Sequence, residues 1–113
     1  MKTTLFLLIV LLTTFSCTRE KVTPIDQQCN STISFSNDVM PILEANCISC
    51  HQPGNTSGGY DLSSYSAIAA NANAIVGSMK ASSYLLMPLG GPALPDSTIQ
   101  KISCWIEQGK QDN

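Results

Sequence analysis

Histidine, aromatic residues and clustered charge are all scarce in this 113-residue chain. It contains one histidine, His51, and aromatic residues make up 6% of the sequence. The formal net charge is −2, and no lysine or arginine cluster occurs, which argues against a nucleic-acid partner because phosphate binding needs concentrated positive charge. The leading apolar run, residues 5–12, is shorter than the roughly 20 residues of a membrane-spanning helix.

The first 17 residues, MKTTLFLLIVLLTTFSC, are typical of a bacterial export signal. Their ending, TFSC, resembles a lipobox, in which a small residue precedes the cysteine that becomes lipidated. We therefore expect residues 1–16 to be a lipoprotein signal peptide and Cys17 to be the acylated first residue of the mature chain. The alternative is an ordinary secretory signal that discards Cys17. Either way the protein is predicted to be exported, and the lipid would make it a periplasmic or cell-envelope lipoprotein held to a membrane.

The five cysteines can all be given roles. If Cys17 carries lipid and Cys47 acts together with Cys50, then Cys29 and Cys104 remain. Two leftover thiols in an oxidising compartment are most easily understood as a disulfide. We expect a bridge between Cys29 and Cys104, with two buried free thiols as the alternative.

Residues 17–32 are polar and suit a tether, which leaves residues 33–113 as one domain. The segment SFSND predicts a helix start with Ser36 or Asn37 as the cap, and this helix is expected to carry Cys47 and Cys50 on its inward face. Residues 52–59 contain one proline and three glycines and predict a loop.

The second half of the domain predicts helices separated by turns. Residues 62–76 favour one or two short helices, whereas the prolines and glycines of residues 78–95 exclude regular structure. A final helix is expected from the capping-box pair Ser97 and Gln100 to Gly109. No strand pattern competes, so the predicted fold class is all-α.

The sequence CISCH, residues 47–51, is the signature of c-type haem attachment. The spacing of Cys47 and Cys50 places both sulfurs on one side of a helical turn, where each can add to a porphyrin vinyl group, and His51 can then ligate the iron. A zinc site would need two more ligands at similar spacing, and a redox-active dithiol would want a βαβ setting. We interpret the motif as a covalent haem site, with zinc, dithiol and chance as alternatives.

Methionine is the expected sixth iron ligand, because the chain has no second histidine. Met1 leaves with the signal peptide, and Met40 lies two turns upstream of the cysteines on the same helix. Met87 and Met79 remain, and Met87 is favoured because it precedes a proline in a glycine- and proline-rich loop that can hold its thioether rigidly.

Three segments together resemble small monohaem cytochrome c domains: SFSNDVMPILEANCISCH, GGYDLSSY and MPLGGPALPDSTIQKISCWIEQG. The resemblance covers residues 33–109. It implies a cytochrome c fold of a few short helices wrapped around one haem c, with thioether bonds at Cys47 and Cys50, and with His51 and Met87 as axial ligands. It also implies that the C-terminal helix packs across the first helix through three residues, Ile99, Ile102 and Trp105.

The predicted function is electron transfer to and from redox partner proteins, since an iron with both axial sites filled admits no substrate. The protein would then be a carrier and not an enzyme. One alternative is a labile sixth site for peroxide or gas chemistry, although no arginine follows Arg19 and no histidine is left as a distal base. A second alternative is a haem-free module in which CISCH binds zinc.

Overall fold

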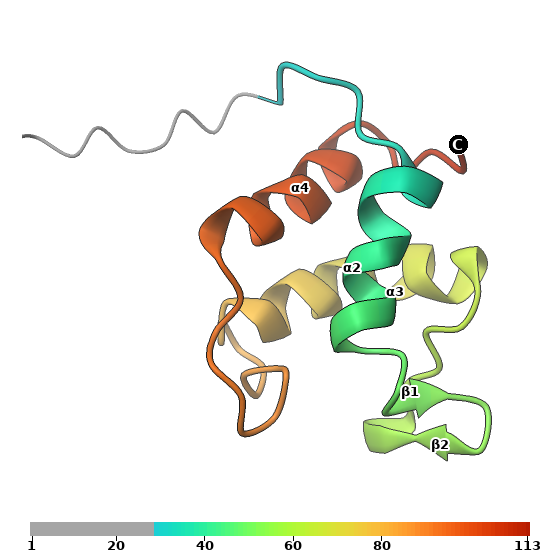
Figure 1. Ribbon diagram of the computed structural model, residues 1–113, viewed down its shortest axis with the longest axis vertical. Coiled ribbons are helices and arrows are strands. Elements are labelled where there is room, and N and C mark those ends of the chain that lie inside the picture. The colour runs from blue at the N-terminus through green and yellow to red at the C-terminus, as the bar shows by residue number, and fades with distance from the viewer. Residues whose placement is uncertain (1–28) are drawn as a thin grey trace, which may run out of the picture.

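The computed structural model describes residues 29–113 (Figure 1). The predicted signal peptide, its boundary at residue 16 and the predicted lipid site Cys17 lie outside the described residues. The elements, in chain order, are η1 (Phe35–Val39), α2 (Met40–Asn46), β1 (His51–Gln52), β2 (Asn55–Thr56), η2 (Ser57–Gly59), α3 (Tyr65–Met79) and α4 (Asp96–Glu107).

The first helical segment begins earlier than the sequence predicts. Ser34 is its N-cap, and the Ser34 hydroxyl accepts a hydrogen bond from the Asn37 backbone N–H at 3.1 Å. The predicted caps, Ser36 and Asn37, lie inside the π-helical turn η1, so that prediction is wrong by about one turn. Pro41 sits at the start of α2, where its missing N–H costs little.

The prediction of an all-α fold is wrong. Only about half of the described residues are helical, and β1 pairs with β2 as a short antiparallel hairpin, with His51 opposite Thr56. The turn between the strands is Pro53–Gly54, and Gly54 has a φ of +87°, which only glycine adopts readily. The segment predicted as a plain loop therefore holds a hairpin followed by the 3₁₀ turn η2.

Helix α3 is one continuous helix of 15 residues, where the sequence pattern favours one or two short helices within residues 62–76. Ser64 is the N-cap, and its hydroxyl accepts a hydrogen bond from the Ala67 N–H. The helix runs on to Met79, three residues past the predicted end, and residues 80–95 then contain no helix or strand.

Helix α4 lacks the predicted capping box. Its N-cap is Pro95, and Ser97 already lies in the first turn, so its side chain does not cap the helix. The helix ends at Glu107, and Gly109, the predicted stop, follows its C-cap Gln108. Gly109 has a φ of +91°, its N–H bonds to the Ile106 carbonyl, and the Lys110 N–H bonds to the Trp105 carbonyl. This pair of bonds is the Schellman arrangement.

The hydrophobic core lies where η1 and α3 pack against α4. Trp105 is fully buried, and its indole N–H donates to the Gln111 carbonyl at 2.9 Å. The Phe35 ring lies 5.0 Å from that of Tyr65 and 5.5 Å from that of Trp105, measured between centroids. Ile99 and Ile102 are buried in the same cluster. Three of the few aromatic residues of the chain, Phe35, Tyr65 and Trp105, therefore pack together in or against the core.

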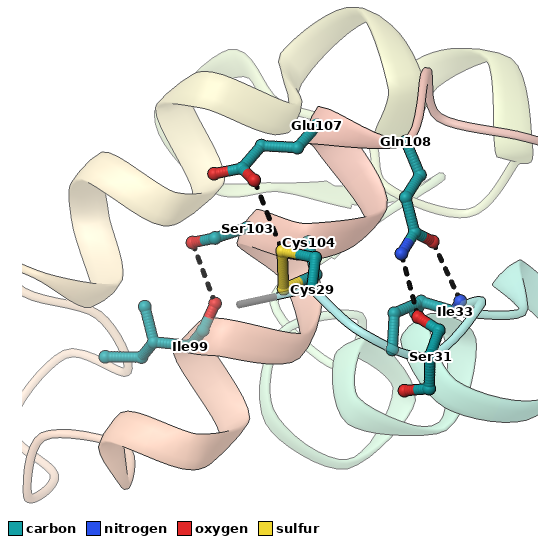
Figure 2. The surroundings of a disulfide bond; sticks show 8 residues. All are labelled: Cys29, Ser31, Ile33, Ile99, Ser103, Cys104, Glu107 and Gln108. Atoms are coloured by element: carbon teal, nitrogen blue, oxygen red, sulfur yellow. Dashed lines mark hydrogen bonds between the residues drawn. A yellow bond between two sulfur atoms is a disulfide. The ribbon is translucent and has the colours of Figure 1, made fainter. Parts of the chain in front are cut away.

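A disulfide joins Cys29 to Cys104 on α4, with Cα atoms 5.3 Å apart across 75 residues of sequence (Figure 2). The Gln108 side chain reinforces this junction, because it donates to the Ser31 carbonyl and accepts from the Ile33 N–H. A Glu107 carboxylate oxygen lies 3.2 Å from the Cys29 sulfur; since a disulfide sulfur carries no proton, this is a contact in which sulfur is not the donor. The start of the domain is thus fixed to its last helix.

Between residues 29 and 113, none of the helices combines the length and the apolar character needed to cross a membrane.

Candidate functional site

The CISCH residues form one tight turn directly after α2. Cys47 is the C-cap of α2, and its N–H bonds to the Leu43 carbonyl at 2.8 Å. The N–H groups of Cys50 and His51 both bond to the Cys47 carbonyl at 3.1 Å. These two hydrogen bonds to one carbonyl keep Cys47, Cys50 and His51 close together in the turn.

The two cysteines differ in their surroundings. Cys47 is half-buried and Cys50 is exposed, and both are free thiols. Helix α2 ends at Asn46, so the expectation that the helix would carry both sulfurs on its inward face is wrong. Burial raises the pKa of the Cys47 thiol to about 11, because the charged thiolate is disfavoured away from water.

The His51 imidazole is oriented by a backbone carbonyl. Its Nδ1 lies 3.3 Å from the Tyr60 carbonyl oxygen, and the two rings meet edge to face at 6.5 Å. A carbonyl oxygen only accepts, so Nδ1 must carry the proton in this contact. In the neutral ring Nε2 is then the unprotonated nitrogen, which is the form that binds a metal ion.

Residues 50–62 fold back on the motif and hold this carbonyl in place. The Ser57 N–H bonds to the Cys50 carbonyl at 3.0 Å, and the Leu62 N–H bonds to the His51 carbonyl at 2.7 Å. Asn55, on β2, donates from its side chain to the Ser49 carbonyl inside the motif at 3.1 Å. The hairpin and η2 therefore cover one side of the CISCH turn.

The two candidate methionines occupy different environments. Met79, at the end of α3, is 2% exposed and belongs to the hydrophobic core. Met87 is half-buried in the segment 80–95, and its N–H bonds to the Ser78 carbonyl at 3.1 Å. In Figure 1 the hairpin and this orange segment both lie at the lower end of the molecule, although no hydrogen bond in the described chain joins them.

The large apolar side chains that are exposed in residues 29–113 belong to the segment 80–95 or, in one case, directly follow η2. Tyr84, Leu85 and Leu89 flank Met87 and are 47%, 66% and 71% exposed, and Tyr60, the residue that binds His51, is 40% exposed. No other large hydrophobic residue in the described chain is exposed to this degree. Tyr84, Leu85 and Leu89 are close together along the chain, and exposed apolar side chains of this kind are available to bind an apolar group.

Within residues 29–113, no group of three or more His, Cys, Asp or Glu side chains is placed to hold a metal ion. A haem iron has a different requirement, because the porphyrin supplies four nitrogens and the protein supplies only the axial ligands. Comparison with protein-family models, curated proteins and solved structures finds no match for this chain.

Two groups at this site are missing from the sequence-based prediction. The Tyr60 carbonyl has no side-chain signature, so only the fold reveals it. Asn55 lies next to the Pro53–Gly54 pair, and that pair is the one signal from which the hairpin, and hence a role for Asn55, could have been anticipated.

Proposed function

We propose that this protein is an electron carrier with one haem c attached through Cys47 and Cys50. The observation that carries the proposal is the His51 imidazole, whose Nδ1 faces the Tyr60 carbonyl and whose Nε2 is left for a metal ion. A histidine placed one residue after two free thiols in a closed turn meets the chemical needs of c-type attachment.

Exposed apolar side chains close in sequence to the predicted ligands support a large apolar ligand. The exposed side chains of Tyr60, Leu85 and Leu89 offer apolar surface next to the predicted ligands, and covering that surface with the apolar porphyrin would stabilise the folded protein. When bound, haem supplies one-electron exchange between ferric and ferrous iron.

Each residue then has a defined task. Cys47 and Cys50 would hold the ring covalently, and His51 would bind the iron. Met87 is the proposed ligand on the other face, since Met79 is packed in the core and would have to leave it to bind. With both His51 and Met87 bound, the iron would have no open site, which favours electron transfer over reactions that need one.

Visible and near-infrared absorption of the purified exported chain tests this function. We expect a sharp ferrous α band, low-spin features and a near-infrared methionine-to-iron band. That band should vanish in Met87→Ala and persist in Met79→Leu, which keeps an apolar side chain of similar volume in the core. A high-spin spectrum in the unmodified protein would favour the labile sixth site, and a colourless protein would favour the haem-free zinc module.

A further inference from the structure

The side chain of Asn55 links the CISCH turn to the segment that orients His51. Its Nδ2 donates to the Ser49 carbonyl at 3.1 Å, and Ser49 is one of the two residues between the cysteines. Its Oδ1 accepts from the Ser57 hydroxyl at 3.4 Å. One amide group thus contacts both the motif and the first residue of η2.

The turn η2 delivers the carbonyl that binds the imidazole. Gly58 and Gly59 have φ values of +64° and +83°, and the Tyr60 N–H bonds back to the Ser57 carbonyl at 3.4 Å. These positive φ values reverse the chain over two residues, which brings the Tyr60 carbonyl back to His51 Nδ1. The position of Ser57 therefore sets the position of that carbonyl.

We propose that Asn55 is a positioning residue for the His51 ligand. Its amide fixes η2 against the CISCH turn and so keeps the Nδ1–H···O=C hydrogen bond closed. This role rests on the proposed function, because it concerns His51 as the iron ligand. A histidine ligand whose second nitrogen donates to a fixed acceptor is a stronger electron donor to its metal, which stabilises the ferric state.

Asn55→Ala in the haem-loaded, full-length protein tests the role, with proton exchange of the His51 Nδ1–H followed by NMR in the ferrous state. We expect exchange to be faster by roughly fivefold, the factor that corresponds to one ordinary hydrogen bond. The reduction potential should rise, because a looser hydrogen bond weakens donation by the imidazole. Asn55→Asp keeps the shape and the Oδ1 acceptor but loses the donor, so its Nδ1–H exchange should match that of Asn55→Ala. The potential is compared only between Asn55→Ala and Gln52→Ala, because the new carboxylate would lower the potential through its own charge.

Gln52→Ala is the matched control. Gln52 lies directly opposite Asn55 in the hairpin, and its side chain makes no hydrogen bond to any described residue. This variant should leave both exchange and potential unchanged. Exchange of the Trp105 backbone amide in the core should stay constant in all three variants, which separates local opening from general destabilisation.

The outcomes distinguish this inference from the function on which it rests. If the unmodified protein carries no haem, the proposed function fails and the Nδ1–H signal of a bound ligand is absent. If haem is present but Asn55→Ala changes neither the Nδ1–H exchange nor the potential, the positioning role is wrong while electron transfer stands. An equal change in Gln52→Ala would also overturn the role, because it would assign the effect to the hairpin as a whole.

Discussion

The ring of Tyr84 lies against the backbone of Gly77 on α3. A Cβ atom placed on Gly77 would be 2.5 Å from Tyr84 Cδ2 and 2.8 Å from Cε2, distances that side chains do not tolerate. The Ser82 N–H bonds to the Gly77 carbonyl at 2.9 Å, so the chain turns back over the same residue. The segment that carries Met87 therefore packs against α3 at Gly77, through the Tyr84 ring and the Ser82 N–H.

The effect of Gly77→Ala on stability is therefore predicted to change sign when the Tyr84 ring is removed. With Tyr84 present, the added methyl group should destabilise the protein by about 1 kcal/mol or more, because the ring must leave its place. In a Tyr84→Ala background the same change should stabilise it by about 0.5–1 kcal/mol, since alanine is the better helix former. Chemical denaturation of the four proteins of this double-mutant cycle measures both values. Additive effects would show that the contact does not exist.

The disulfide between Cys29 and Cys104 is predicted to be a major source of stability. It joins two residues that are 75 positions apart in sequence, and it therefore lowers the conformational entropy of the unfolded chain. Cys29→Ala combined with Cys104→Ala should lower the free energy of unfolding by about 2–5 kcal/mol in urea titrations. A dithiol reductant should weaken the unmodified protein similarly and leave the double variant unaffected. A loss well below this range would mean that the bridge adds little.

The sequence predicted those helices whose signals are local and strong. The alanine-rich residues 62–76 predict a helix where α3 lies, and Gly109 predicts the end of α4. The hairpin was missed because strands of two residues are too short to show alternation, leaving only Pro53–Gly54 as a sign. The capping box failed because Pro95 already stands at the N-cap, two residues before Ser97.

That Cys47, Cys50 and His51 lie together could be predicted from the sequence, whereas the groups that hold the His51 ring could not. Cys47, Cys50 and His51 are adjacent in sequence, so one turn brings them together. The Tyr60 carbonyl reaches His51 only through a hairpin and two glycines with positive φ, and this path leaves no pattern in the side chains. The different burial of Cys47 and Cys50 depends on where α2 ends, which sequence patterns place only to within a few residues.

The half-buried Cys47 thiol is predicted to make the stability of the haem-free chain pH-dependent. Its pKa of about 11 lies above the ordinary value of 9.0, because burial disfavours the thiolate. The unfolded chain therefore releases this proton at lower pH than the folded one. The contribution of the neutral Cys47 thiol to the free energy of unfolding is therefore fully present below pH 9 and is lost as the pH rises through 11. Unfolding of haem-free Cys50→Ser between pH 8 and pH 11 should show this loss.

Cys47→Ala in the same Cys50→Ser background is the control for that titration. It removes the thiol, so the part of the pH dependence that comes from Cys47 should disappear, whereas every other contribution is common to the two proteins. Equal slopes in the two proteins would contradict a raised pKa at Cys47. Once a thioether has formed, the thiol no longer exists, so the haem-loaded protein should lack this component as well.

Covalent attachment of haem at the CISCH turn can be tested by peptide mass spectrometry of the exported protein. The protein should be produced in a bacterial host that matures c-type cytochromes and then digested without reduction. We expect the peptide containing residues 47–51 to gain the mass of one haem, and Cys47→Ser combined with Cys50→Ser to abolish the gain. An unmodified peptide whose two thiols both react with an alkylating reagent would contradict it.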